Sequence, residues 1–404
     1  MFSNFDWRPC SAIYRVADQG AETQSDAGHW LHVLRELIRE QVSVGVSESG
    51  VFRVDTASEA PHESPRYLYC ETSGSSGRPK VVRRTQASWI ESFEINKSIL
   101  NLCAQDCAVV FSSVHNSLAL YGVLEAVHVG ADVMSLHGIR PDKQLNEIER
   151  AGGSILYITP TQLGLMCGAF VGHSSVLSVR HILVGGGQLS QGVRDKAAQV
   201  FPNSTLTHFY GAAETSFIAW SDDTTPPGSV GRAYPNVVIS IRDQAGSEKS
   251  KSGEIWVKSP YLFEGYASVE SGDTKWDEAF LSIGEFGRLD MDGNLFVAGR
   301  KSRMVTIADH NVFPEEIEAF LAARVDADHV AVVPRPDAKR GNQLVAVIAG
   351  ACVAASVDEL LRACRQGLGA LKSPKEIRLV PEIPLLIGGK PDYVAISRLV
   401  ESKT

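Results

Sequence analysis

Strand-like apolar runs alternate with helix-like stretches along the middle of the chain, between about residues 86 and 210. Alternation at this spacing indicates a largely parallel sheet with helices on its faces. Upstream, Trp30, Val33, Leu34, Leu37 and Ile38 recur at helical spacing and predict an amphipathic helix. The predicted strands cover 108–112, 132–136, 155–159, 181–184 and 206–210, and the predicted helices cover about 86–100, 118–129, 141–151, 161–170 and 189–200.

The pattern changes between about residues 228 and 298 to short strands separated by turns. Runs at 237–242 and 253–258 are strand-like, and Asp292-Gly293 is a tight-turn signal. This section predicts a β-rich subdomain over about 228–300.

A third section of about 100 residues begins near residue 301, and a mixed section of this size can fold alone. We therefore predict an α/β protein with a large N-terminal domain, 1–301, and a small α+β C-terminal domain, 302–404, divided at Lys301–Arg303. Within the small domain the expected helices lie near 314–323, 356–367 and 392–400, and the expected strands at 329–334, 344–349 and 376–380.

Composition narrows the class of protein. The chain has 404 residues, of which 44% are hydrophobic and 21% charged, as in ordinary globular proteins. A net charge of −8 gives no sign of a nucleic-acid or membrane partner, and no apolar run approaches the ~18 residues that span a bilayer. Residues 1–8 lack the order of a signal peptide, and seven scattered cysteines indicate free thiols. We therefore expect a cytoplasmic protein.

The most distinctive local feature is the loop 72–80, T-S-G-S-S-G-R-P-K, between strand-like runs at 67–71 and 81–85. Such a loop can direct backbone N–H groups, hydroxyls and an ammonium at a polyphosphate. A Walker A loop would need G-x-x-x-x-G-K-[ST] and would open a helix, whereas here Pro79 precedes Lys80 and a β-branched pair follows. The sequence predicts a phosphate-binding hairpin loop; a polar surface hairpin is the alternative.

The loop resembles the signature phosphate loop of the adenylate-forming superfamily, which contains acyl-CoA synthetases, peptide-synthetase adenylation domains and luciferases. A second match is 209–215, F-Y-G-A-A-E-T, which resembles the superfamily motif Y-G-x-[ST]-E-[ST]. The resemblance implies that Tyr210 stacks on adenine and that Glu214 holds Mg²⁺ on the triphosphate, roles that suit an aromatic face and a hard carboxylate. Ala213 replaces a hydroxyl that contacts the α-phosphate, so that contact is missing or comes from elsewhere, such as Thr215.

Further matches follow in the superfamily's order. Glu285 and Arg300 stand where T-G-D and G-R motifs are expected, which implies that Glu285 accepts the ribose hydroxyls and Arg300 contacts ribose or phosphate. The G-G-G turn at 185–187 resembles one that borders adenine and the acyl pocket, and His115 occupies a position often beside the acyl group. The nucleotide-binding residues that the resemblance implies are Thr72, Ser73, Gly74, Ser75, Ser76, Gly77, Lys80, Gly186, Gly187, Tyr210, Gly211, Thr215, Glu285 and Arg300.

The C-terminal section carries two matches and two departures. The run 311–318, N-V-F-P-E-E-I-E, resembles the superfamily's helix entry. The run 384–390, P-L-L-I-G-G-K, resembles the motif whose lysine, here Lys390, reaches the carboxylate and the α-phosphate. Ser302 occupies the hinge position about which the small, mobile domain rotates in the superfamily. Ala308 and Asp309 stand where paired glycines often line the pantetheine tunnel, a departure that concerns the thiol acceptor more than adenylation.

The resemblance covers roughly residues 66–404 and implies an AMP-forming acid–thiol ligase. With ATP and Mg²⁺ it would convert a carboxylic acid to an acyl-adenylate and pyrophosphate, with Lys390, Glu214 and His115 as catalytic residues, and coenzyme A would displace AMP. No aspartate for an amino group appears in 114–121, which favours an aromatic or fatty acid. Superfamily members usually carry a longer segment before the phosphate loop. We therefore expect a more open acyl pocket, or one completed by the second subunit of a homodimer.

Two alternatives stay open. In the first, adenylation is kept but the acceptor is the phosphopantetheine arm of a separate acyl carrier protein, as the altered turn at Ala308-Asp309 suggests. In the second, the chain binds nucleotide without chemistry, an interpretation motivated by Glu285, Ala213 and the short N-terminal section. Retention of Lys390 argues against the second, because binding alone would not need it.

Overall fold

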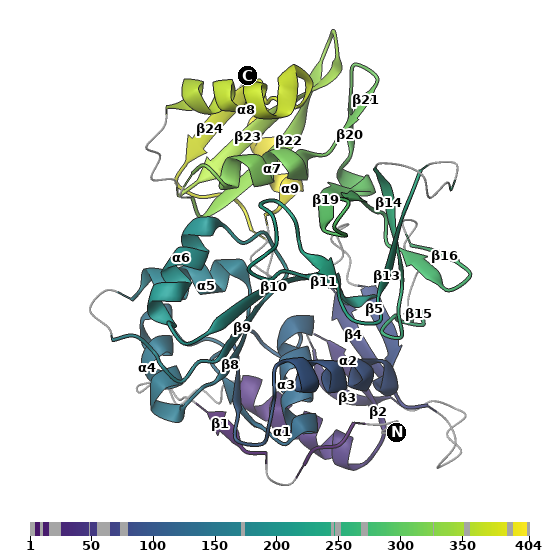
Figure 1. The fold of residues 1–404 in the computed structure, drawn as a ribbon, viewed down its shortest axis with the longest axis vertical. Coiled ribbons are helices and arrows are strands. Elements are labelled where there is room, and N and C mark those ends of the chain that lie inside the picture. Colours follow the sequence, from purple (N-terminus) through teal and green to yellow (C-terminus); the bar gives the residue numbers. More distant parts are fainter. Residues whose placement is uncertain are drawn as a thin grey trace.

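The structure is a computed structural model, and its α/β architecture confirms the predicted fold class (Figure 1). A large unit of three sheets carries the N-terminal and central parts of the chain, and a small unit carries the C-terminal part. The domain boundary at Lys301–Arg303 stays a prediction. The structure describes residues 5–8, 11–15, 26–47, 49–54, 65–72, 80–170, 174–243, 246, 252–267, 274–325, 327–350, 356–385 and 391–401.

The first sheet of the large unit has eight strands in the order β1-β7-β6-β8-β9-β10-β11-β12. Within this order the neighbouring strands β1, β7, β6, β8, β9 and β10 are parallel, as the alternating pattern predicted. Strands β11 and β12 add an antiparallel edge. The strands are β1 (Ile13–Arg15), β6 (Cys107–Val110), β7 (Asp132–Ser135), β8 (Ile155–Ile158), β9 (His181–Val184), β10 (Thr205–Ala212), β11 (Ser216–Trp220) and β12 (Arg232–Ala233).

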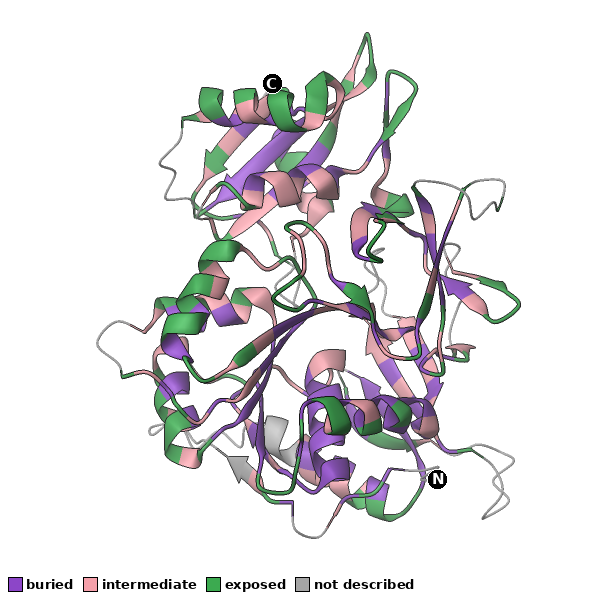
Figure 2. Ribbon diagram, viewed as in Figure 1, coloured by how far each residue is buried: buried purple, intermediate pink, exposed green. Residues whose placement is uncertain are grey.

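The helices that flank this sheet begin at polar caps that the sequence supplies. Thr85, Asn116 and Ser190 each accept a hydrogen bond from a backbone N–H in the first turn, and Thr159 forms a full capping box with Gln162. Every residue of β6 and β8 is buried, because helices cover both faces of the sheet (Figure 2). The helices are α2 (Gln86–Ile99), α3 (Ser117–Val129), α4 (Pro141–Ala151), α5 (Pro160–Gly168) and α6 (Gln191–Val200).

The second sheet contains the predicted hairpin. Strands β4 (Tyr67–Thr72) and β5 (Lys80–Thr85) are antiparallel, with Thr72 opposite Lys80, and residues 73–79 lie outside the described part of the chain. The order is β15-β5-β4-β2-β3, so β15 (Gly265–Tyr266) joins from far along the sequence. The sequence pattern did not predict β2 (Ser43–Ser47) or β3 (Gly50–Val54), which adjoin the predicted helix α1 (Asp26–Arg39).

The third sheet forms the predicted β-rich section. Its strands follow the order β16-β17-β14-β18-β19, and β13 pairs with β14. Asp292 and Gly293 form the turn between β18 and β19, where Gly293 has a φ of 80°. The strands are β13 (Val238–Arg242), β14 (Gly253–Lys258), β16 (Lys275–Asp277), β17 (Phe280–Ser282), β18 (Glu285–Leu289) and β19 (Leu295–Arg300).

The small unit follows a short 3₁₀ turn, η1 (Lys301–Arg303), and has its own buried clusters. Its sheet has the order β22-β23-β24, and a separate hairpin of β20 and β21 projects beside it (Figure 1). The elements are β20 (Val305–Ile307), β21 (His310–Val312), α7 (Pro314–Ala322), β22 (His329–Asp337), β23 (Gly341–Ala349), α8 (Val357–Lys372), β24 (Glu376–Val380) and α9 (Tyr393–Glu401). Among the described residues, no helix has the length and apolarity to cross a bilayer.

The β20–β21 turn has an unusual composition. Ala308 and Asp309 have φ angles of 46° and 62°, so both adopt the left-handed conformation that favours glycine. These are the positions where the superfamily resemblance implied paired glycines. The turn therefore keeps the backbone conformation expected of two glycines although side chains occupy both positions.

A bulge at the end of β10 depends on Gly211. The β10–β11 register shifts between Tyr210 and Gly211, and a Cβ atom at Gly211 would lie 1.9 Å from the carbonyl oxygen of Ser216. No side chain fits in that space. The absence of a Cβ thus lets the chain reverse tightly after Tyr210.

A carboxyl group lies at the centre of the large unit. Glu125 of α3 is fully buried and accepts hydrogen bonds from Asn96 Nδ2 at 2.8 Å, from the Tyr121 hydroxyl at 3.1 Å and from the Tyr157 hydroxyl. The hydroxyl of Tyr234 extends this network by donating to Asn96 Oδ1 at 2.7 Å. Burial raises the pKa of Glu125 to about 7, although the three hydrogen bonds act in the opposite direction.

The raised pKa predicts that stability depends on pH. Because the folded protein holds the Glu125 proton up to about pH 7 and the unfolded chain releases it at the ordinary value, this group's stabilising contribution is fully present below the ordinary pKa. It is lost as pH rises toward and through 7. Thermal unfolding of the wild type and Glu125→Gln from pH 4.5 to 8 should show a fall that is weaker in the variant. Parallel pH profiles would contradict this prediction.

Substitution of Gly211 should destabilise the large unit. We expect Gly211→Ala to lower the free energy of unfolding by about 2–3 kcal/mol, because the new methyl group must displace the backbone at Ser216. Gly192→Ala is the matched control, since Gly192 lies in α6 and its Cβ would meet no atom within 4 Å. Chemical denaturation of both variants measures the difference, and equal stabilities would rule out the steric argument.

Candidate functional site

Tyr210, Glu285 and Arg300 meet where β10 faces the third sheet. The Tyr210 hydroxyl donates to Glu285 Oε2, and Arg300 Nε donates to Glu285 Oε1 at 3.0 Å. Glu285 and Arg300 are directly opposite each other in the β18–β19 register. The Glu285 side chain is 9% exposed, and its negative charge raises the pKa of Arg300. The structure thus brings together an aromatic ring, a carboxylate and a guanidinium that the sequence resemblance had assigned to one nucleoside.

A second group joins Glu214 to the base of the phosphate-loop hairpin. Tyr266 donates from its hydroxyl to Glu214 Oε1 at 2.8 Å, and the Lys80 Nζ atom lies 5.5 Å from the centre of the Tyr266 ring. The pairing of β15 with β5 brings Tyr266 to this position. Burial, reinforced by the charge of Glu214, raises the pKa of Tyr266, so its hydroxyl stays a donor to the carboxylate.

Arg84 of β5 holds these parts together from inside the protein. Its side chain is buried and donates to the carbonyl oxygens of Ala213 at 3.2 Å and Tyr261 at 2.5 Å. It also lies 5.1 Å from the centre of the Trp89 ring. Burial lowers the pKa of Arg84 to about 10, so the group is still charged at neutral pH. The hairpin and the turn that carries Glu214 are therefore joined by one cation.

Thr215 stabilises the turn between β10 and β11. Its hydroxyl is buried, accepts from the Ala212 N–H at 3.1 Å and lies 3.3 Å from the carbonyl oxygen of Ser216. This hydroxyl is the candidate to replace the one missing at Ala213, and in this structure it is engaged in local hydrogen bonds.

The glycine turn after β9 lies against the same strand end. A Cβ at Gly185 would lie 2.1 Å from the Phe209 ring, so the turn approaches β10 closely, and Gly186 has a φ of 85°. The Gly187 carbonyl oxygen and His208 Nε2 are 2.9 Å apart. Burial lowers the pKa of His208 to about 4, so the neutral ring donates this hydrogen bond at physiological pH.

His115 has separate surroundings. Its Nδ1 atom lies 3.2 Å from the Ser113 hydroxyl, and its ring is 6.3 Å from that of Trp30. The expected phosphate-loop residues Ser73, Gly74, Ser75, Ser76 and Gly77, and the expected catalytic Lys390, lie outside the described residues. Their roles stay predictions.

The donor set at Glu214 fits one mode of magnesium binding. Among the described residues, no group of three or more His, Cys, Asp or Glu side chains could hold a metal by itself. Mg²⁺ on a nucleotide is usually bound by one or two carboxylates together with phosphate oxygens and water. A single carboxylate beside Lys80 and the hairpin is consistent with that mode and not with an all-protein metal cage.

Sequence reasoning missed three contributors to the site: Arg84, Tyr266 and Glu315. Glu315 Oε1 accepts from the Arg300 backbone N–H at 3.2 Å and lies 3.4 Å from Arg303 Nη1. Burial raises the pKa of Glu315, against the nearby charge of Arg303. Glu315 lies in a run that resembles the superfamily's helix entry, but that resemblance gave it no role, and no local pattern distinguishes Arg84 or Tyr266, whose partners lie far away in the sequence.

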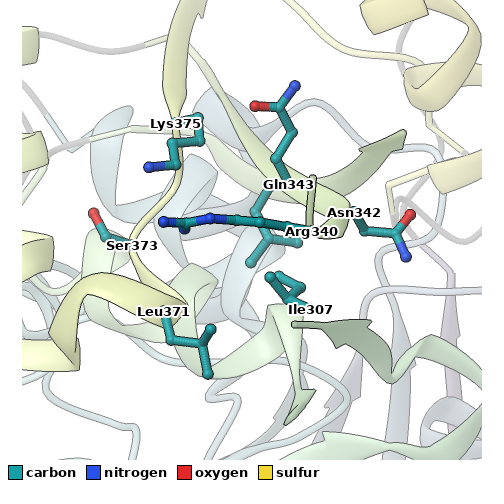
Figure 3. Close-up of a pocket in the computed structure, with 8 residues that line it drawn as sticks. Ile307, Arg340, Asn342, Gln343, Leu371, Ser373 and Lys375 are labelled. Carbon is teal, nitrogen blue, oxygen red and sulfur yellow. The ribbon is translucent and has the colours of Figure 1, made fainter. Parts of the chain in front are cut away.

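A small notch in the small unit lies apart from these groups. Arg340, Lys375 and Ser373 line it together with Asn342, Gln343 and three aliphatic side chains (Figure 3). Its volume of about 10 Å³ leaves room for one water molecule. We therefore do not assign the notch as a substrate pocket.

Comparison with known proteins matches each of the two units to a family model. The model for AMP-binding enzymes matches residues 13–267, and the model for the AMP-binding enzyme C-terminal domain matches residues 316–390. An uncharacterized acyl-CoA ligase, YhfT, of Bacillus subtilis is 33% identical over 81% of this chain and 67% of its own length. A putative long chain fatty acid-CoA ligase, VraA, of Staphylococcus epidermidis is 26% identical over 69% of this chain and 59% of its own length.

A solved structure shows the same fold. The amide bond synthetase McbA from Marinactinospora thermotolerans superposes with a TM-score of 0.70 at 25% identity, over 92% of this chain and 78% of McbA. The chain spans between 59% and 67% of the length of the curated relatives that it matches. The homologues are acyl-CoA ligases, and the chain belongs to the AMP-binding enzyme family of the adenylate-forming superfamily.

Proposed function

We propose that this protein activates a carboxylic acid with ATP and passes the acyl group to a thiol. The acid's carboxylate oxygen bonds to the α-phosphorus, the bond to the bridging oxygen breaks, and pyrophosphate leaves. The thiolate of coenzyme A then attacks the acyl carbon, and AMP departs with its phosphate oxygen. The observation that carries the proposal is the cluster of Tyr210, Glu285 and Arg300, which supports a nucleoside site in a chain of this family.

In this proposal the Tyr210 ring provides a flat surface for adenine. The ribose hydroxyls would replace the Tyr210 hydroxyl as donors to Glu285, while Arg300 keeps that carboxylate oriented. The Arg300 hydrogen bond to Glu285, at 3.0 Å, involves the carboxylate oxygen that Tyr210 does not contact, so the ribose could bind without displacing it.

The triphosphate would lie toward the hairpin. Lys80 and the loop residues from Thr72 to Gly77 would hold phosphate oxygens, and Glu214 would hold Mg²⁺ with Tyr266 orienting its carboxylate. When bound, the metal ion would neutralise charge on the phosphates. Lys390 would stabilise the negative charge that develops at the α-phosphate during attack.

The acid in this proposal is aromatic or fatty, with a pocket near His115, Gly187 and Phe217. VraA is named as a putative long chain fatty acid-CoA ligase, which supports an acid of the same class. The acceptor is coenzyme A. An acyl carrier protein is the alternative acceptor, and McbA, named as an amide bond synthetase, supports testing an amine as well. A homodimer that completes the acyl pocket is part of the same proposal.

Adenylation should depend on Lys390. We expect pyrophosphate release from Mg·ATP with at least one aliphatic or aromatic acid, and a roughly 100-fold lower kcat in Lys390→Ala. Lys375→Ala is the matched control, since Lys375 is an exposed lysine of the same unit. Nucleotide binding without pyrophosphate release from any acid would favour the non-catalytic alternative. Supplying coenzyme A, a phosphopantetheinylated carrier protein or an amine in separate assays identifies the acceptor.

Substitution of Glu285 should change the KM for ATP and not the KM for the acid. Glu285→Gln removes the charge that Arg300 pairs with, and we expect the KM for ATP to rise roughly tenfold while the KM for the acid stays unchanged. Glu254→Gln is the matched control, because it breaks an equivalent 3.0 Å ion pair with Lys275 elsewhere in the same sheet. An equal ATP effect in both variants would argue against a direct role for Glu285.

A further inference from the structure

The chain passes from the large unit to the small unit at Ser302. On one side, the Lys301 backbone N–H donates to the Gly284 carbonyl oxygen at 2.8 Å and fixes that residue to the third sheet. On the other side, the Arg303 side chain is held by groups of the small unit. Ser302 lies exposed between these two anchors.

Arg303 is anchored by groups from several small-unit elements. Its guanidinium donates to the Glu318 carboxylate at 2.7 and 3.1 Å and to the Val332 carbonyl oxygen at 3.1 Å. The Tyr393 ring centre lies 3.6 Å from the guanidinium carbon. These contacts make Arg303 move with the small unit.

Glu315 reaches back across this junction. It lies in the first turn of α7, beside β19 (Figure 1), and its carboxylate accepts from the Arg300 N–H at 3.2 Å. The same carboxylate packs against Gly299, where a Cβ would lie 2.5 Å from Glu315 Oε2. Next to it, the rings of Phe313 and Phe286 are 5.4 Å apart. A small-unit side chain thus fixes the backbone of the residue whose guanidinium holds Glu285.

We propose that Glu315 is a positioning residue for the nucleotide site, coupling the orientation of the small unit to the placement of Arg300. The inference rests on the proposed function, since it takes Arg300 as a nucleotide contact. Rotation at Ser302 that carried α7 away from β19 would break the Glu315 hydrogen bond. Arg300 would then lose this backbone hydrogen bond and be held by the β18–β19 pairing alone, so the Glu285 carboxylate would have a less firmly placed partner.

A purely structural role makes different predictions. Glu315 also lies 3.4 Å from Arg303 Nη1, so it could act by stabilising the small unit alone. Glu318 offers the matched control, because it binds Arg303 more closely and, in the described part of the chain, makes no hydrogen bond with Arg300. Loss of Glu318 would loosen Arg303 without touching the backbone of β19.

The test is direct titration of Mg·ATP binding to the full-length protein, with thermal unfolding measured in parallel. We expect Glu315→Ala to weaken binding roughly tenfold. Glu315→Gln should keep most of the affinity, because its amide oxygen can still accept from the Arg300 N–H. Glu318→Ala should lower the unfolding temperature without a comparable loss of affinity. In an Arg300→Ala background, Glu315→Ala should have no further effect on binding.

The opposite results would overturn the inference. Unchanged affinity in Glu315→Ala, an equal loss in Glu318→Ala, or full additivity with Arg300→Ala would each assign Glu315 a structural role only. If Glu315→Ala does not fold, the same comparison is made with Glu315→Gln and Glu315→Asp, where a loss confined to the shorter side chain supports positioning. A wild-type protein that binds no Mg·ATP would reject the proposed function itself, and with it this inference.

Discussion

The candidate site depends on one buried cation. Arg84 donates to the carbonyl oxygens of Ala213 and Tyr261, and these two acceptors come from segments that are far apart in the sequence. An ionised group inside a protein is stable only when its donors are satisfied, so the three segments are confined to one arrangement. In that arrangement Lys80, at the start of β5, lies 5.5 Å from the Tyr266 ring, whose hydroxyl binds Glu214. The arrangement of these polar side chains thus depends on the buried hydrogen bonds of Arg84.

The apolar core positions the other half of the site through strand alternation. Phe209 and Tyr210 are neighbours on β10, so their side chains leave opposite faces of the strand. The Phe209 ring packs 4.7 Å from that of Phe217 and closes on Gly185, while Tyr210 is directed to Glu285. Because the packing of Phe209 holds β10 in register, the Tyr210 hydroxyl on the opposite face has little freedom to move. Core packing therefore pre-organises the polar cluster.

Much of the fold could be predicted from the sequence, because buried parallel strands such as β6 and β8 appear as short apolar runs between helices. The motifs also located Tyr210, Glu285 and Arg300 before their contacts were known. The partnership of Tyr266 with Glu214 could not be predicted, because it follows from the long-range pairing of β15 with β5. The resemblance placed a turn at Ala308 and Asp309, but strands β20 and β21 on either side were not predicted, because three residues are too few to show a strand pattern.

The two anchors on either side of Ser302 restrict how the units can move. One residue supplies two soft backbone dihedrals, which permit swivelling but almost no extension. The small unit would therefore rotate about a pivot beside Arg300. A modest torsional change at Ser302 would produce displacements that grow with distance from that pivot. Elements near the pivot, such as α7, would move less than the far end of the small unit, but a 3.2 Å hydrogen bond such as that of Glu315 is broken by a small displacement.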